Sequence, residues 1–225
     1  MNYESVLVLG ATGPTGKNVV EQLAKSKMNP KIFALCRNPN NFDEKTKILC
    51  DGVIQGNARE RKDLKLALDQ SNADIVIVAI GNGKSLKKDD IRTASAEALV
   101  SVLRQPQYSH VHVLVVSTIG AGDSRIIAGR GMGLFLEYYI RHVLTDHNGQ
   151  EAAFLNAMKD RTMIVRPTGL TENEATGKVV LFDGKKKCPT MKIDRKDLAE
   201  WLVSEAMFGN AGSFGSKPIH ITCMN

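Results

Sequence analysis

The chain has 225 residues, of which 30 are Lys or Arg and 24 are Asp or Glu, so its formal net charge at pH 7 is +6. Hydrophobic residues make up 43% of the chain, enough for a full core, and no apolar stretch is long enough to span a membrane. The basic residues are scattered apart from clusters at residues 84–88 and 185–187, and aromatic residues make up only 5%. We therefore expect neither nucleic acid nor a membrane as a partner.

The four cysteines stand far apart, at Cys36, Cys50, Cys188 and Cys223, and none forms a C-x-x-C pair. This spacing indicates free thiols and supports neither a metal site nor a disulfide framework. The first residues include no apolar segment of the signal-peptide type. We expect a cytoplasmic protein.

The N-terminal segment combines an apolar strand, a glycine-rich turn and a helix. Residues 6–9 read V-L-V-L, and the turn that follows reads G-A-T-G-P-T-G. Gly10 allows a sharp turn, Gly13 lets backbone N–H groups approach phosphate oxygens, and Gly16 allows close packing of the helix on the sheet. A purely structural turn is the alternative. Because a helix N-terminus attracts anions, we expect a dinucleotide diphosphate here, bound by Gly10, Thr12, Gly13, Pro14, Thr15 and Gly16.

A second strand, predicted over residues 31–36, ends at Arg37, where NAD and NADP are distinguished. An acidic residue at this point accepts hydrogen bonds from the ribose 2′-hydroxyl of NAD, whereas a guanidinium suits the 2′-phosphate of NADP. The alternative is a solvated surface arginine. We expect NADP(H) as the cofactor.

Strand and helix patterns alternate along the rest of the chain, which is typical of a parallel sheet covered by helices. Glycine and arginine are frequent in residues 123–133, where we predict a mobile loop over the cofactor cleft. Strands are predicted over residues 52–57, 74–80, 111–116, 162–165, 179–181, 191–193 and 219–222, and helices over residues 61–68, 91–104, 134–144, 149–158 and 195–207.

These elements predict an α/β fold with a doubly wound, Rossmann-like parallel sheet. We expect a single NAD(P)-binding domain of residues 1–225. Within it, a small C-terminal lobe from about residue 170 to 225 would contribute the substrate side.

Seven segments together resemble one family along nearly the whole chain. The chain resembles the atypical short-chain dehydrogenases/reductases of the NmrA-like, NAD(P)-binding group, near the biliverdin reductase B/flavin reductase type. The matching segments are Gly10-Ala11-Thr12-Gly13-Pro14-Thr15-Gly16, Leu35-Cys36-Arg37-Asn38, Gln55-Gly56-Asn57, Ala79-Ile80-Gly81, Val116-Ser117-Thr118-Ile119-Gly120-Ala121, Ile164-Val165-Arg166-Pro167-Thr168-Gly169-Leu170 and Ile193-Asp194-Arg195-Lys196-Asp197-Leu198-Ala199.

The resemblance implies further site residues. Asn57 stands where relatives usually have Asp, and would lie beside the adenine. Thr118 stands where relatives have a catalytic Ser or Thr, and with Ser117 would face the reacting ring. For this pair the alternative is a polar strand end that satisfies its own turn. Other cofactor contacts would be Ala58, Ala79, Ile80, Gly81, Ser117, Pro167, Thr168 and Gly169.

The chain departs from many relatives at the Tyr-x-x-x-Lys pair, whose ammonium lowers the pKa of the phenol so that it can exchange a proton with the substrate. Leu144 and Asn148 fill those places, and neither can do this work. Tyr138 and His142 keep a one-turn spacing nearby, although Tyr138 and Tyr139 fit an ordinary half-buried aromatic pair better.

The Asp146-His147 pair lies in the same region. The imidazole of His147 is a candidate to donate or relay a proton, and an exposed Asp-His pair at a helix start is the alternative. The biliverdin reductase B type also lacks the Tyr-Lys pair, and by analogy its conjugated acceptors take a proton from solvent.

The leading hypothesis is an NADPH-dependent oxidoreductase that transfers hydride to a small conjugated or carbonyl acceptor of the flavin, quinone, tetrapyrrole or enone type. Its candidate catalytic residues are Thr118, Ser117 and His147. The alternative is a catalytically idle, NADP-binding regulator that reports redox state to a protein partner. An isomerase or epimerase would need the missing Tyr-Lys pair.

Overall fold

The computed structural model describes residues 3–83, 85–209 and 214–224, so Lys84 of the first basic cluster lies outside the described residues. The strands are β1 (Ser5–Leu9), β2 (Lys31–Cys36), β3 (Gly52–Gln55), β4 (Ile75–Val78), β5 (His112–Val116), β6 (Thr162–Pro167), β7 (Gly169–Thr171), β8 (Val179–Phe182), β9 (Lys192–Asp194) and β10 (Ile219–Cys223). The helices are α1 (Pro14–Ala24), α2 (Glu44–Lys47), α3 (Arg61–Ser71), α4 (Ile91–Leu103), α5 (Met132–Tyr139), α6 (Arg141–Met158) and α7 (Arg195–Phe208).

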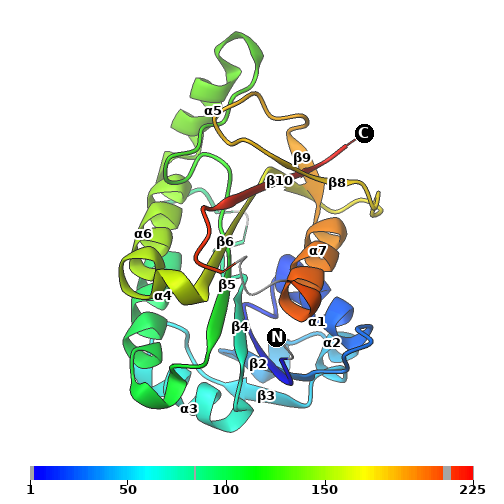
Figure 1. The fold of residues 1–225 in the computed structure, drawn as a ribbon, viewed down its shortest axis with the longest axis vertical. Coiled ribbons are helices and arrows are strands. Elements are labelled where there is room, and N and C mark those ends of the chain that lie inside the picture. The colour runs from blue at the N-terminus through cyan, green and yellow to red at the C-terminus, as the bar shows by residue number, and fades with distance from the viewer. Residues whose placement is uncertain (1–2, 84, 210–213, 225) are drawn as a thin grey trace.

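The main sheet has eight strands in the order β3-β2-β1-β4-β5-β6-β10-β8 (Figure 1). Its strand pairs are parallel except for β10 and β8, which run antiparallel. The strand order reverses between β1 and β4, and a crevice at such a point, beyond the carboxyl ends of the strands, is where open α/β sheets bind ligands. The predicted doubly wound, Rossmann-like sheet is confirmed.

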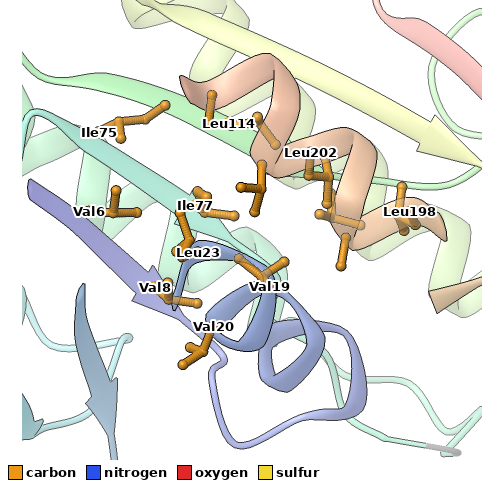
Figure 2. Close-up of a cluster of buried hydrophobic side chains, with 14 of the residues drawn as sticks. Val6, Val8, Val19, Val20, Leu23, Ile75, Ile77, Leu114, Leu198 and Leu202 are labelled. Carbon is orange, nitrogen blue, oxygen red and sulfur yellow. The ribbon is translucent and has the colours of Figure 1, made fainter. Parts of the chain in front are cut away.

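Helices cover both faces of the sheet, which explains why its central strands are buried and largely apolar. In Figure 1, α4 and α6 lie on one side of the sheet, and α1 and α7 lie on the other. Side chains alternate along β1, so Val6 and Val8 pack toward α1 and α7, whereas Leu7 and Leu9 belong to the opposite cluster. Figure 2 shows the first cluster, in which Val19 of α1 lies near Leu198 of α7.

The C-terminal segment is divided between two sheets. β10 and β8 extend the main sheet, while β7 pairs with β9 in a separate two-stranded parallel sheet. The packing of α7 against α1 joins this segment to the N-terminal half. The expected lobe therefore contains two strands that the sequence did not assign to the main sheet, because a short apolar strand does not reveal its pairing partner.

One helix boundary and one burial prediction around residue 140 are wrong. Gly149, expected to begin a helix, lies inside α6, where a Cβ would stand 2.2 Å from the Oγ1 atom of Thr93 on α4. The glycine therefore serves a close helix contact and does not mark a boundary. Tyr138 and Tyr139, expected to be half-buried, are 68% and 61% exposed on α5. None of the helices in the described ranges combines the length and apolar character needed to cross a membrane.

Candidate functional site

The glycine-rich turn joins β1 to α1 with little room for side chains. Gly10 has a φ of +88°, and a Cβ there would lie 2.5 Å from the carbonyl oxygen of Ala79 on the neighbouring chain segment. A Cβ on Gly16 would lie 2.2 Å from the carbonyl oxygen of Gly10. Helix α1 begins at Pro14. Its N-cap residue is Gly13, which has no side chain to cap the helix N-terminus. The first-turn N–H groups of α1 therefore form a site that an anion can cap.

A hollow of about 160 Å³ lies beside this turn, at the carboxyl ends of β2, β3 and β4. Asn57 borders it and is fixed by two local hydrogen bonds, one from its own N–H to the Oδ2 atom of Asp63 (2.8 Å) and one from the Arg59 N–H to its Oδ1 atom (3.1 Å). The hollow gathers these predicted residues: Gly10, Thr12, Gly13, Arg37, Asn57, Ala58, Ala79, Ile80 and Gly81.

A shallow polar depression adjoins the hollow and is lined by Thr12, Arg37, Asn38 and Asn41. Arg37 is exposed, and among the residues of known placement its guanidinium forms no ion pair. The following 3₁₀ turn is held by the Asn40 N–H, which donates to the Oδ1 atom of Asn38 (3.0 Å). The depression thus presents guanidinium, amide and hydroxyl groups, which suits a phosphate.

A second cavity of about 280 Å³, here called the inner cavity, runs from the glycine-rich turn to the ends of β5 and β6. Gly16, although predicted as a contact, is not among the residues lining either space and serves helix packing. The inner cavity gathers these predicted residues from distant parts of the chain: Gly13, Pro14, Thr15, Ala79, Ile80, Gly81, Ser117, Thr118, His147, Pro167, Thr168 and Gly169.

Ser117 belongs to a buried charged cluster beneath the inner cavity. Its hydroxyl donates to the Oε1 atom of Glu151, whose carboxylate also accepts from Arg166 Nε (2.9 Å) and Nη2 (2.6 Å). Arg166 Nη1 donates to the Oδ1 atom of Asp123 (2.8 Å), at the start of the predicted loop. Ser117, Glu151 and Arg166 are each less than 5% exposed. The cluster fixes Ser117, while the adjacent Thr118 is only half-buried at the cavity wall.

The Asp146-His147 pair is buried within α6, so the exposed helix-start interpretation is wrong. Burial and the charge of Arg92 lower the pKa of His147 to about 3, so its imidazole is neutral near pH 7. The Nδ1 atom lies 3.3 Å from the Oε1 atom of Gln150. Because that oxygen only accepts, Nδ1 carries the proton and Nε2 is a hydrogen-bond acceptor. His147 therefore enters the cavity wall as a neutral ring.

Leu144 and Asn148 do not line the inner cavity. Leu144 is 8% exposed and packs beside Gly120. The Oδ1 atom of Asn148 accepts from the Gly122 N–H (2.7 Å) and so holds the segment after β5. The side of α6 that reaches the cavity carries His147 instead.

The inner cavity also contains three charged residues that the sequence did not single out. Arg195 and Glu172 form an ion pair of 3.2 Å at its edge, and Arg92 is buried in its wall. A lone arginine in the first turn of a helix is a weak sequence signal, and only its long-range contact with Asp146 reveals its position.

The uncapped helix N-terminus, the glycine-rich turn and the two connected spaces define a dinucleotide-binding protein of Rossmann type. Residues 10–207 match the model of the NAD(P)H-binding family. The chain belongs to this family. The expectation of an NAD(P)-binding protein is therefore confirmed.

Solved structures share the fold at low sequence identity. The oxidoreductase ylbE from Lactococcus lactis is 20% identical, with 97% of this chain and 90% of that chain covered and a TM-score of 0.73. A short-chain dehydrogenase/reductase from Veillonella parvula in complex with NADP is 16% identical, with 98% and 94% covered and a TM-score of 0.75. The anaerobillin reductase ChuY from Escherichia coli O157:H7 is 16% identical, with 96% of each chain covered and a TM-score of 0.73. Comparison with curated proteins gives no match.

Proposed function

We propose that this chain is an NADPH-dependent oxidoreductase that transfers hydride to a small conjugated or carbonyl acceptor of the flavin, quinone, tetrapyrrole or enone type. When bound, NADPH supplies the hydride from its nicotinamide ring. The net reaction consumes NADPH, a proton and the oxidised acceptor, and yields NADP⁺ and an acceptor with two more electrons and two more protons. The names of the structural neighbours ylbE and ChuY support a reductase.

The observation that carries this proposal is the composition of the inner cavity. Among the described residues, its lining includes Thr118 and His147 but no tyrosine or lysine. The neutral His147 ring is a poor acid near pH 7, since its pKa is about 3. A conjugated acceptor needs no strong protein acid, because its reduced form takes a proton from water. The cavity therefore favours conjugated acceptors over simple ketones.

The proposed roles of the cavity residues follow from their contacts. The half-buried Thr118 would orient the acceptor through its hydroxyl, and Ser117, fixed by Glu151, would hold the end of β5 in place. The Nε2 atom of His147 would accept a hydrogen bond from the bound nucleotide or acceptor. Pro167 and Gly169 would lie against the nicotinamide end, where they border the same cavity.

We further propose NADP as the preferred cofactor, with the 2′-phosphate in the depression beside Arg37. The guanidinium, which has no ion-pair partner in the described part of the chain, and the neighbouring amides of Asn38 and Asn41 support this choice over NAD. We also propose that residues 1–225 act as one domain in the cytoplasm. The four free thiols support that compartment.

Purified protein should be mixed with NADPH and one member of each acceptor class, and the loss of NADPH absorbance should be followed. We expect reduction of at least one acceptor above the protein-free rate. Thr118→Val, which keeps the side-chain shape and removes the hydroxyl, should lower kcat/KM for that acceptor. If NADPH binds and none of the four classes is reduced, the proposed activity is wrong.

A regulator that binds NADP without turnover is the second candidate, and one observation favours it. Helix α5 carries five large apolar side chains that are each more than half exposed, a surface available to a protein partner. A regulator should bind NADP⁺ and NADPH with different affinities in calorimetry while consuming neither. The exposed side chains are Met132, Leu134, Phe135, Tyr138 and Tyr139.

A further inference from the structure

Arg92 is held in the wall of the inner cavity by a single carboxylate. It is the second residue of α4 and is 8% exposed. Its backbone N–H donates to the Oδ2 atom of Asp146 (3.1 Å), and its Nη1 atom donates to the same oxygen (3.2 Å). The other oxygen of Asp146 accepts from the N–H (2.9 Å) and the hydroxyl (3.0 Å) of Thr93. Asp146 thus fixes the start of α4 and shares its charge among several donors.

The guanidinium of Arg92 has N–H donors without a hydrogen-bond partner among the described residues. In the described part of the chain, its Nε atom is buried without a hydrogen-bond partner. The Nη2 atom lies beside Gly81, where a Cβ would stand 3.1 Å away, and Gly81 and Arg92 line the same cavity. A buried guanidinium with an unused donor at a cavity wall is costly unless a ligand completes its hydrogen bonds. Carboxylates and phosphates fit this planar donor group best.

Arg195 also lines the inner cavity, and its Nε atom likewise has no hydrogen-bond partner among the described residues, but its guanidinium already has a carboxylate at the cavity edge. The Glu172 side chain is 63% exposed and is paired with Arg195 (3.2 Å). His147 is neutral at pH 7, since burial and the charge of Arg92 lower its pKa to about 3. Within the described residues, this lining carries Arg92 and Arg195 against Glu172, and Asp146 behind the wall offsets part of the charge of Arg92. An anionic ligand group is favoured at the wall formed by α4 and α6.

The diphosphate of a dinucleotide does not need Arg92. The anion site of the glycine-rich turn belongs to α1, which covers the face of the sheet opposite to α4 and α6 (Figure 1). Arg92 reaches the inner cavity from α4 and is tied to α6 through Asp146, next to His147. Under the proposed function, we place the acceptor against this wall, between Arg92 and His147, which line the same cavity.

We propose that Arg92 binds an oxyanion, a carboxylate or a phosphate, carried by the acceptor, and so selects anionic over neutral acceptors. This inference rests on the proposed reductase activity. Arg92 is then a specificity-determining residue, held in position by Asp146.

Two pairs of acceptors test this selection, because each pair shares one reducible system and differs in one anionic group. FMN and riboflavin differ in a phosphate, and the 4-carboxylate of benzylideneacetone differs from benzylideneacetone in a carboxylate. We expect the wild-type protein to favour the anionic member of at least one pair about tenfold or more in kcat/KM. The pair that responds distinguishes a phosphate from a carboxylate. Arg92→Gln should reduce that preference to less than about twofold, mainly through KM.

Two further variants separate recognition from folding and from overall charge. Arg92→Lys keeps the charge beside Asp146 but loses the planar fork, so we expect an intermediate preference. Arg104→Gln removes the same charge from an exposed position at the other end of α4 and should leave the preference unchanged.

A binding measurement without turnover completes the test. Quenching of flavin fluorescence by the protein with NADP⁺ should give tighter binding of FMN than of riboflavin, and Arg92→Gln should remove the difference. Equal kcat/KM values within both pairs for the wild type would leave the reductase standing and overturn the role of Arg92. A loss of NADPH affinity in Arg92→Gln with unchanged acceptor preference would overturn it too. If no acceptor is reduced, the proposed activity fails, and equal binding of the two flavins then also removes the anion site.

Discussion

The two ends of the cleft are built in different ways. At the end proposed to bind the adenosine, here called the adenosine end, the turn from Gly10 to Gly16 and the nearby Arg37 come from neighbouring stretches of sequence, and the turn acts largely through its backbone. At the inner end, the cavity wall depends on side-chain contacts between distant elements, such as Ser117 with Glu151 and Arg92 with Asp146. Dinucleotide binding, the property shared by the family, therefore depends on local backbone geometry. The proposed acceptor selection depends on side-chain contacts between distant parts of the chain.

Removing the carboxylate of Glu151 should have the largest effect, which is a loss of stability at the inner end of the cleft. Among the described residues, Glu151→Gln leaves the buried charge of Arg166 with only the exposed Asp123 as an ionic partner, so the free energy of unfolding should fall by about 3 kcal/mol. Denaturant unfolding measures this change. Glu174→Gln, which breaks a surface pair with Lys196, should have little effect. Equal stabilities of the two variants would show that the buried cluster does not support the site.

A methyl group at Gly10 should weaken nucleotide binding at the adenosine end of the cleft. In Gly10→Ala the Cβ would clash with the carbonyl oxygen of Ala79 at 2.5 Å, so we expect NADPH and NADH to bind at least about 100-fold more weakly, or about 2.8 kcal/mol. Calorimetry measures both affinities. Gly177→Ala is the matched control, because Gly177 also has a positive φ (+65°), but no described residue other than its chain neighbours lies within 4 Å of the new methyl group. Normal nucleotide binding by Gly10→Ala would refute the proposed phosphate site.

The adenosine end was predictable because its signals are local. Gly10 and Gly16 must lack a Cβ for reasons set by residues only a few positions away, or by the next parallel strand. The order of the main-sheet strands up to β6 was equally readable, since buried parallel strands are largely apolar, whereas the short elements α2 and β7 were not predicted. The assignment of β8 to the main sheet was not, because it pairs antiparallel with β10, about forty residues further along the chain.

The inner end was predictable only in part. The candidates Ser117, Thr118 and His147 line the cavity. Because the place of a side chain around a helix changes by about 100° for each residue, Leu144 and Asn148, which align with the Tyr-Lys pair, lie off it. Arg92 and Asp146 are 54 positions apart, and nothing in their local sequence links them. Burial of His147, which decides its charge, likewise depends on packing between α4 and α6.

Reversing the charge of Arg37 should affect the binding of NADPH and NADH differently at the adenosine end. Arg37→Glu would turn a charge-assisted contact with the 2′-phosphate into a repulsion, so NADPH should bind about 30-fold more weakly, or about 2 kcal/mol. NADH, which lacks that phosphate, should change little. Lys27→Glu makes the same charge change at an exposed position beyond α1 and should leave both affinities unchanged. Equal losses for NADPH and NADH in Arg37→Glu would place the phosphate elsewhere.

The smallest effect should come from the protonation of His147, which links the inner end to overall stability. Its pKa is about 3 in the folded chain against 6.5 for a free imidazole, with burial as the first cause and the charge of Arg92 as the second. As the pH falls below 6.5, the unfolded chain takes up a proton that the folded chain refuses, so stability decreases toward pH 3. Between pH 7.5 and 5.5 this amounts to about 1.4 kcal/mol.

Denaturant unfolding at several pH values measures this slope. Burial also lowers the pKa values of His112 and His220, so the contribution of His147 is the difference between the wild type and His147→Asn. The asparagine amide can still donate to the Oε1 atom of Gln150 but does not titrate. An unchanged slope in His147→Asn would mean that the ring is solvated and can carry a proton near pH 7, which would restore His147 as a candidate acid for the reaction.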